Sequence, residues 1–155
     1  MVQMLEVHEN VMAAELGFAP LLADDILLLT LEMCLGELPL IFSLPVEQVL
    51  SLGPRLIQEG AQAISISAPR GAMPETKGDG PGERGIVTGR LYGPSLFPRG
   101  LETVYSAAKL GLPIIGAGGV WTKENAEAML SAGALAVQVD AALWGVSWLS
   151  QSSME

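Results

Sequence analysis

The sequence predicts an α/β fold, a partial (β/α)8 TIM barrel in which about five parallel strands alternate with helices. Strand and helix patterns follow one another along the chain, and half of its 155 residues are hydrophobic, as buried parallel strands require. Residues 113–131 read as a buried strand, a glycine turn and a helix. Because a complete barrel needs about 250 residues, we expect a single half-barrel-like domain over residues 1–155.

Short apolar runs predict the strands in order. A first, short strand is expected at Met4–Val7. Four further strands are expected at Leu40–Leu44, Ala63–Ser67, Ile114–Ala117 and Ala136–Val139. Consecutive βα units with right-handed crossovers would arrange these strands as a curved parallel sheet that has not closed.

Apolar residues at helical spacing predict the helices between the strands. They are expected at Asp24–Gly36, Val46–Glu59 and Gly100–Leu110. The pair Gly53-Pro54 is expected to kink or interrupt the second of these helices. A fourth helix should begin after its N-cap Thr122 and end at Gly133, and a short closing helix is expected through Trp144 and Trp148.

Residues 68–99 are expected to form a long loop, rich in Gly, Pro and basic residues, within this domain. The formal net charge of the chain is −9, yet five of its eight basic residues lie in this loop. These five are Arg70, Lys77, Arg84, Arg90 and Arg99. Two interpretations stay open: a solvated, mobile loop, or a lid that meets an anionic small molecule.

The composition excludes several classes of partner and location. The acidic charge argues against nucleic acid, and no uncharged apolar run is long enough to span a membrane. The first residues lack the basic segment of a signal peptide, and a single cysteine cannot form an internal disulfide. We therefore expect a cytoplasmic protein. Because an open sheet edge invites association, a second copy, a partner subunit or a missing N-terminal half should cover it.

The glycine turn at residues 116–119 is the clearest candidate binding site. Gly116, Gly118 and Gly119 stand between a buried strand and a helix, where backbone N–H groups can surround a phosphate. The alternative is a glycine turn needed only for packing. The match to G-x-G-x-x-G at residues 80–85 is rejected because no strand leads into it. With His8 as the single histidine, no metal site is expected.

Four motifs, taken in order, resemble the C-terminal half of the dihydroorotate dehydrogenase family. They are Gly89–Pro94, Pro113–Val120, Ala132–Ala134 and Ala136–Val139. The resemblance is strong from about Gly89 to Leu143 and moderate from Leu38 to Ser67. Members of this family are FMN-dependent (β/α)8 barrels that oxidise dihydroorotate to orotate in pyrimidine synthesis. The resemblance therefore implies an FMN-binding oxidoreductase domain.

The resemblance also implies cofactor-binding positions. Gly118 and Gly119 match the family's turn that binds the FMN phosphate through backbone N–H groups. Gly89 and Gly93 match the first and last glycines of the family's Gly-Gly-x-Ser-Gly loop. These four glycines are the positions at which the chain keeps the family's residue.

At other positions the chain departs from the family. Asp140 and Ala141 stand where the family usually has Gly-Thr, whose backbone also holds the phosphate. A carboxylate there repels a phosphate unless Arg90, or another cation, neutralises it. Ser43 replaces a lysine that contacts the flavin, and Ala68 replaces a flavin-contacting asparagine.

The catalytic base of the family has no counterpart that the sequence identifies. If Leu5–His8 is the strand that precedes the base, the following residues are Asn10, Val11, Met12 and Ala13. None of these side chains is a credible base, so the catalytic residue is unknown.

Two functions follow, and a third possibility concerns the gene. The first is an FMN-dependent oxidoreductase of the dihydroorotate dehydrogenase type, completed by a partner chain or by self-association. The second is a non-catalytic structural subunit, or a module that binds a phosphorylated small molecule on the same scaffold. The chain could also be a fragment of a longer gene product.

Overall fold

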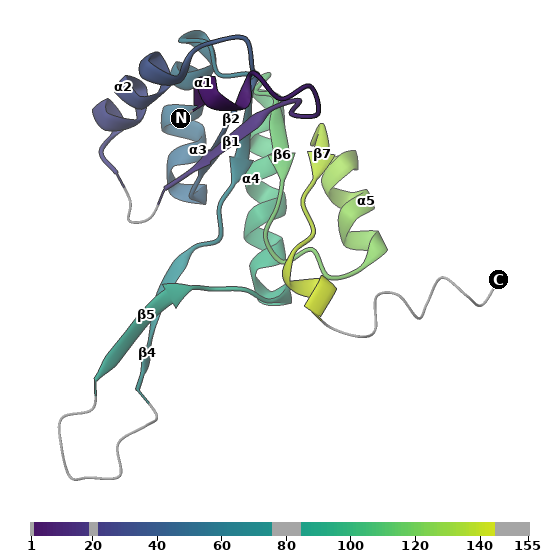
Figure 1. Ribbon diagram of the computed structural model, residues 1–155. Helices are drawn as coiled ribbons and strands as arrows, with labels where there is room; N and C mark the ends of the chain where they lie inside the picture. The colour runs from purple at the N-terminus through teal and green to yellow at the C-terminus, as the bar shows by residue number, and fades with distance from the viewer. Residues whose placement is uncertain (1, 19–21, 76–84, 145–155) are drawn as a thin grey trace.

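Five parallel strands form the main sheet in the order β1-β2-β3-β6-β7, as a computed structural model of residues 2–18, 22–75 and 85–144 shows (Figure 1). The strands span Ala14–Gly17, Leu40–Leu44, Ala63–Ile66, Ile114–Gly116 and Ala136–Val137. Their order in the sheet follows their order in the chain, so each connection crosses to the neighbouring strand. This is the architecture of a partial (β/α)8 barrel, and the predicted fold class is confirmed.

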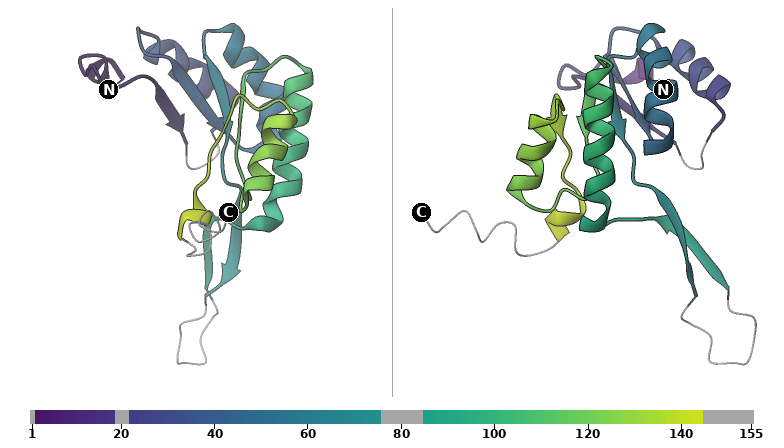
Figure 2. Two further views of the ribbon diagram at one scale, coloured as in Figure 1. Left: turned by 90° about the vertical axis from the view of Figure 1, so that its right-hand side faces the viewer. Right: turned by 180° about the vertical axis from the view of Figure 1, so that it is seen from behind.

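Four of the described helices lie on one face of the sheet, and the other face bears none of them (Figure 2). They are α2 (Asp24–Cys34), α3 (Val46–Gln58), α4 (Phe97–Lys109) and α5 (Lys123–Ser131). Helix α3 packs on β2 and β3, α4 on β6, and α5 on β7, with α2 beside α3. In the described part of the chain no helix is long and apolar enough to cross a membrane.

The core lies between the helices and one face of the sheet. Alternate residues of β2 are buried, namely Leu40, Phe42 and Leu44, and Ile64 is in register with Phe42 on β3. Burial of these large apolar side chains is the main stabilising contribution. The same register places Ser43 beside Ser65, so polar side chains gather on the face that carries no helices.

Helix α5 begins and ends where the sequence predicts. The Thr122 side chain accepts a hydrogen bond from the backbone N–H of Asn125, and the Asn125 side chain accepts one from the backbone N–H of Thr122. The hydrogen bond of Glu124 with the Thr122 side chain is the main cause that lowers the pKa of the Glu124 carboxyl. Gly133 follows the last turn with φ +108°, the conformation of a C′ glycine.

Helix α3 runs through Gly53 and Pro54 as one helix, so an interruption at this pair is wrong. A Cβ on Gly53 would lie 3.3 Å from Leu112 Cδ1 and 3.6 Å from Ile64 Cγ1. The glycine therefore serves a close approach of the helix to the sheet. Packing of this apolar helix face outweighs the one backbone hydrogen bond that a proline removes.

The predicted first strand at Met4–Val7 is wrong. Residues Val2–Leu5 form a short helix, α1, and the first strand is β1 at Ala14–Gly17. Leu5 and Val7 are 37% and 78% exposed, so they contribute little to a core. Residues 10–13 consequently precede the first strand. They do not form the loop after a strand in which the family resemblance implies the catalytic base.

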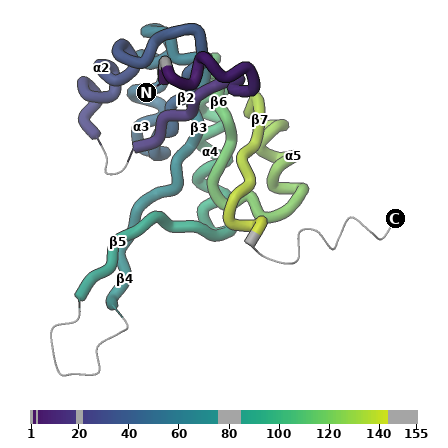
Figure 3. The backbone as a smooth tube through the Cα atoms, in the orientation of Figure 1, coloured from purple at the N-terminus to yellow at the C-terminus, as the bar shows by residue number. Residues whose placement is uncertain are grey.

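Residues 68–99 contain a hairpin where a long loop was expected. Strands β4 (Arg70–Pro74) and β5 (Ile86–Arg90) pair antiparallel and project away from the sheet (Figure 3). A short 3-10 turn at Pro94–Leu96 then leads into α4. Lys77 and Arg84 lie outside the described residues. The closing helix is a 3-10 turn at Ala141–Trp144, and Trp148 also lies outside the described residues.

Candidate functional site

One cavity of about 380 Å³ lies at the carboxyl ends of β2, β3, β6 and β7. Barrels of this architecture place their active sites at this end of the strands. Seven of the eight predicted binding residues line the cavity: Ser43, Ala68, Gly93, Gly118, Gly119, Asp140 and Ala141. Gly89 does not line it, because it lies in β5 and pairs with Gly71 of β4.

The glycine turn forms one wall of this cavity. Gly118 and Gly119 have φ values of +92° and +69°, a region that other residues rarely adopt. A Cβ on Gly118 would meet no atom within 4 Å, whereas a Cβ on Gly119 would collide with the backbone of Phe97. Within the described residues, the backbone N–H groups of both glycines donate no hydrogen bond. The turn thus offers two backbone donors to an anion.

The N-terminus of α5 contributes less to the cavity than its place next to the glycine turn in the sequence suggests. Asn125 Oδ1 accepts hydrogen bonds from the backbone N–H groups of Trp121 and Thr122, each at 3.2 Å. The capping box thus engages the backbone N–H groups of Trp121, Thr122 and Asn125, and no residue of α5 lines the cavity. The glycine turn is therefore the part of this segment that presents unbonded backbone N–H groups at the cavity.

Charged side chains of both signs line the cavity. Arg90, at the end of β5, lines it together with the carboxylates of Asp140 and Glu15. In the part of the chain that the structure describes, neither Arg90 nor Asp140 forms an ion pair. The other described cations of the basic segment lie elsewhere: Arg99 pairs with Glu47 at 2.6 Å, and Arg70 does not line this cavity.

Glu15 is a lining residue that the sequence did not single out. Its carboxylate accepts a hydrogen bond from Ser65 Oγ at 2.5 Å and another from Gln138 Nε2 at 2.9 Å. Glu15 lies on β1 and Gln138 directly follows β7, so this network joins the two edge strands of the sheet. The signal in the sequence that could have identified Glu15 is that it is the one acidic residue in an otherwise apolar strand.

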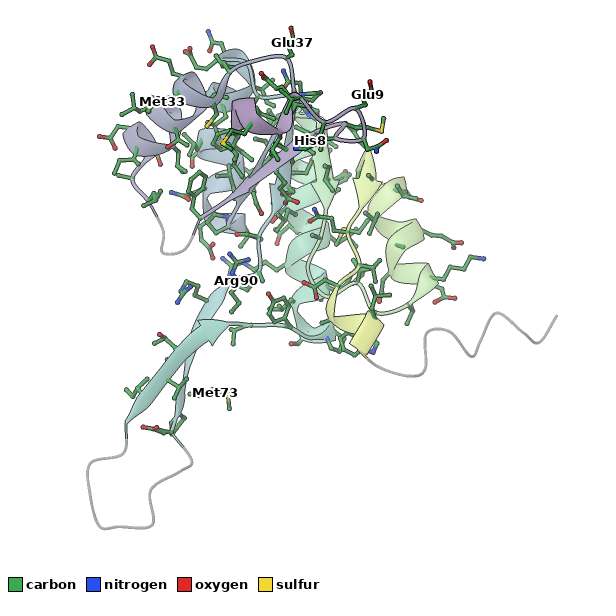
Figure 4. All side chains as sticks on the ribbon, in the orientation of Figure 1. His8, Glu9, Met33, Glu37, Met73 and Arg90 are labelled. Carbon is green, nitrogen blue, oxygen red and sulfur yellow. The ribbon has the colours of Figure 1, made fainter. Side chains whose placement is uncertain are left out.

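Groups typical of flavin chemistry are missing from the predicted positions. Ser43 and Ala68 bring a hydroxyl and a methyl group to the cavity, where the family resemblance implies an amine and an amide. His8 lies at the other end of the sheet from Arg90 (Figure 4). Among the described residues, no group of His, Cys, Asp and Glu is arranged to hold a metal ion.

Comparison with known proteins gives a consistent picture. The family model described as "Dihydroorotate dehydrogenase" matches residues 71–152, more than half of the chain. The catalytic subunit of dihydroorotate dehydrogenase B (NAD(+)) from Thermodesulfovibrio yellowstonii is 37% identical over 86 residues, which cover 55% of this chain and 28% of that protein. The corresponding subunit from Petrotoga mobilis is 29% identical over 125 residues, covering 78% of this chain and 41% of that protein.

A solved structure shares the fold. The crystal structure of DHODH from Eimeria tenella, in complex with ferulenol, matches with a TM-score of 0.54 and 21% identity. The match covers 70% of this chain and 30% of the Eimeria chain. The curated relatives are matched over only 19% to 41% of their own length.

Alanine substitutions distinguish the two glycines of the turn. Gly118→Ala should lower the free energy of unfolding by about 1–2 kcal/mol, the cost of a positive φ. Gly119→Ala should lower it by about 3 kcal/mol, because the new methyl group also meets the Phe97 backbone. Urea unfolding followed by circular dichroism measures both. Equal losses would contradict the described packing of α4 against the turn.

Proposed function

Because the chain belongs to the dihydroorotate dehydrogenase family, we propose that its cavity binds FMN and that it acts in a dihydroorotate dehydrogenase-type oxidoreductase of pyrimidine synthesis. The observation that carries the proposal is the Gly118-Gly119 turn, which offers two backbone donors beside the ends of three other strands. FMN, when bound, would take up the two electrons removed from the substrate. This chain would contribute the phosphate end of the site.

The residues present fit a phosphate at this turn. The space where a Cβ of Gly118 would lie is open, so an anion can approach the backbone closely. We propose that Gly118 and Gly119 hold the phosphate and that Gly93, Ser43 and Ala68 border the rest of the cofactor. Gly89 stays in the hairpin and would act through the position of the loop that follows it.

The charge balance of the cavity also permits a phosphate. Asp140 occupies a position where a carboxylate repels the anion, and Ala141, which follows it, also lines the cavity. Arg90 lines the same cavity and has no carboxylate partner among the described residues. We propose that its guanidinium offsets Asp140 when the phosphate is bound.

A second function is favoured by the replaced residues. With Ser43 and Ala68 in the cavity, the described residues there include no lysine, cysteine or histidine. This composition suits a module that binds a phosphorylated small molecule and leaves the oxidation to another chain, or has lost it. The two functions share the phosphate site and differ in whether dihydroorotate is oxidised.

Titration of the purified chain with FMN tests both functions. We expect saturable quenching of flavin fluorescence, and Gly118→Asp should weaken binding at least tenfold because it places a negative charge at the phosphate. Gly111→Asp is the matched control. Gly111 also has a positive φ, of +74°, and open space around its Cβ position, but it does not line the cavity.

Addition of dihydroorotate to the FMN complex then separates the alternatives. Bleaching of the flavin absorbance would support the oxidoreductase, and binding without bleaching would support the binding module. A chain that binds no FMN, or a Gly111→Asp variant as impaired as Gly118→Asp, would contradict the proposed phosphate site.

We further propose that a second copy or a partner subunit covers the open edges of the sheet in the cytoplasm. Strands β1 and β7 are edge strands with unpaired backbone groups on one side. Sedimentation velocity should therefore show a species larger than one chain at micromolar concentration. A monomer at all concentrations would contradict self-association and leave the partner subunit as the proposed cover.

A further inference from the structure

Two arginines face each other at the root of the hairpin. Arg70 is the first residue of β4 and Arg90 the last of β5, and the two are directly paired in the register of the hairpin. Directly opposed residues of antiparallel strands have side chains on the same face, and like charges in such a pair are destabilising. Both side chains are exposed, and a negatively charged group bound between them would relieve this repulsion.

The root is held in place by the protein. The backbone N–H of Leu91 donates a hydrogen bond of 2.7 Å to the carbonyl oxygen of Pro69, directly beside the arginine pair. The Leu91 side chain lies so close to Gly71 that a Cβ there would be 2.7 Å from its Cδ1 atom. The two guanidinium groups thus start from fixed backbone positions.

A second cavity, of about 160 Å³, lies at this root. Arg70 and Arg90 both line it, together with Ser67, Ala68 and Glu47. Ser67, Ala68 and Arg90 also line the larger cavity, so the two spaces adjoin. A ligand in the larger cavity can therefore extend a charged group toward the arginine pair.

No carboxylate of the described residues forms an ion pair with either arginine. Glu47 lines the second cavity, but its Oε1 atom is paired with Arg99 at 2.6 Å. Neither Arg70 nor Arg90 forms an ion pair in the described ranges. Elsewhere the chain is strongly acidic, with a net charge of −9, so two unpaired arginines in one cavity are a local exception.

We propose that Arg70 and Arg90 form an oxyanion clamp that binds a carboxylate or phosphate group of a ligand held in the larger cavity. Guanidinium groups suit this task because they bind planar oxyanions through paired hydrogen bonds. The clamp goes beyond the proposed FMN phosphate site, and it exists whether or not FMN binds. One of its two arginines, Arg90, lines the same cavity as Ser43, which stands where the family resemblance implies a lysine.

Orotate and uracil are matched probes, since they share the pyrimidine ring and differ by one carboxylate. Titration into the purified chain without FMN, followed by calorimetry, should give an affinity for orotate at least tenfold higher than for uracil. Arg70→Gln and Arg90→Gln should each weaken orotate binding about tenfold and leave uracil binding unchanged. Inorganic phosphate is the third probe: displacement of orotate identifies a general oxyanion clamp, and failure to displace it a carboxylate clamp.

Arg55→Gln is the matched control because it removes the same charge from an exposed side chain of α3 that lines neither cavity. Circular dichroism confirms that each variant is folded. The proposal is overturned if the wild-type chain binds orotate no better than uracil, or if Arg55→Gln weakens orotate binding as much as Arg70→Gln and Arg90→Gln do. Because FMN is absent throughout, these results are independent of the FMN titration.

Discussion

The carboxylate of Glu15 holds together the face of the sheet on which the candidate site depends. A five-stranded parallel sheet with two open edges has no closed barrel to fix its curvature. Glu15 reaches from edge strand β1 to Ser65 on β3 and to Gln138 beyond edge strand β7. Ser65 is fully buried, so its hydroxyl needs this acceptor. Since Asp140 and Ala141 follow Gln138, the same network positions the last wall of the cavity.

The cavity combines a glycine turn with side chains that differ from those the family resemblance implies. Gly118 and Gly119 have positive φ values beside Ser43 and Ala68, which stand where the family resemblance implies a lysine and an asparagine. Positive charge stands at the hairpin root, on Arg70 and Arg90, at the border between two cavities. Two arginines thus stand side by side at this border although the chain as a whole is acidic.

Local patterns predicted those parts of the structure that local interactions determine. The strand at Leu40–Leu44, the cap at Thr122 and the glycine C′ at Gly133 depend on nearby residues and agree with the structure. The strand at Ala14–Gly17 was missed because it is four residues long and carries Glu15, whose partners lie 50 and 123 positions away. The hairpin was missed because glycine and proline obscure its two strands. The family resemblance identified seven positions that line one cavity in the structure. The pairing of Arg70 with Arg90, by contrast, could be seen only from the register of β4 and β5.

The central claim is that the Gly118-Gly119 turn binds a phosphate through its backbone. Amide ¹H–¹⁵N spectra of the chain, recorded during titrations with FMN and with riboflavin, test it most directly because the two ligands differ only by the phosphate. The account predicts that FMN shifts the Gly118 and Gly119 amide resonances strongly and that riboflavin leaves them nearly unchanged. Equal shifts with both ligands, or none with FMN, would contradict it.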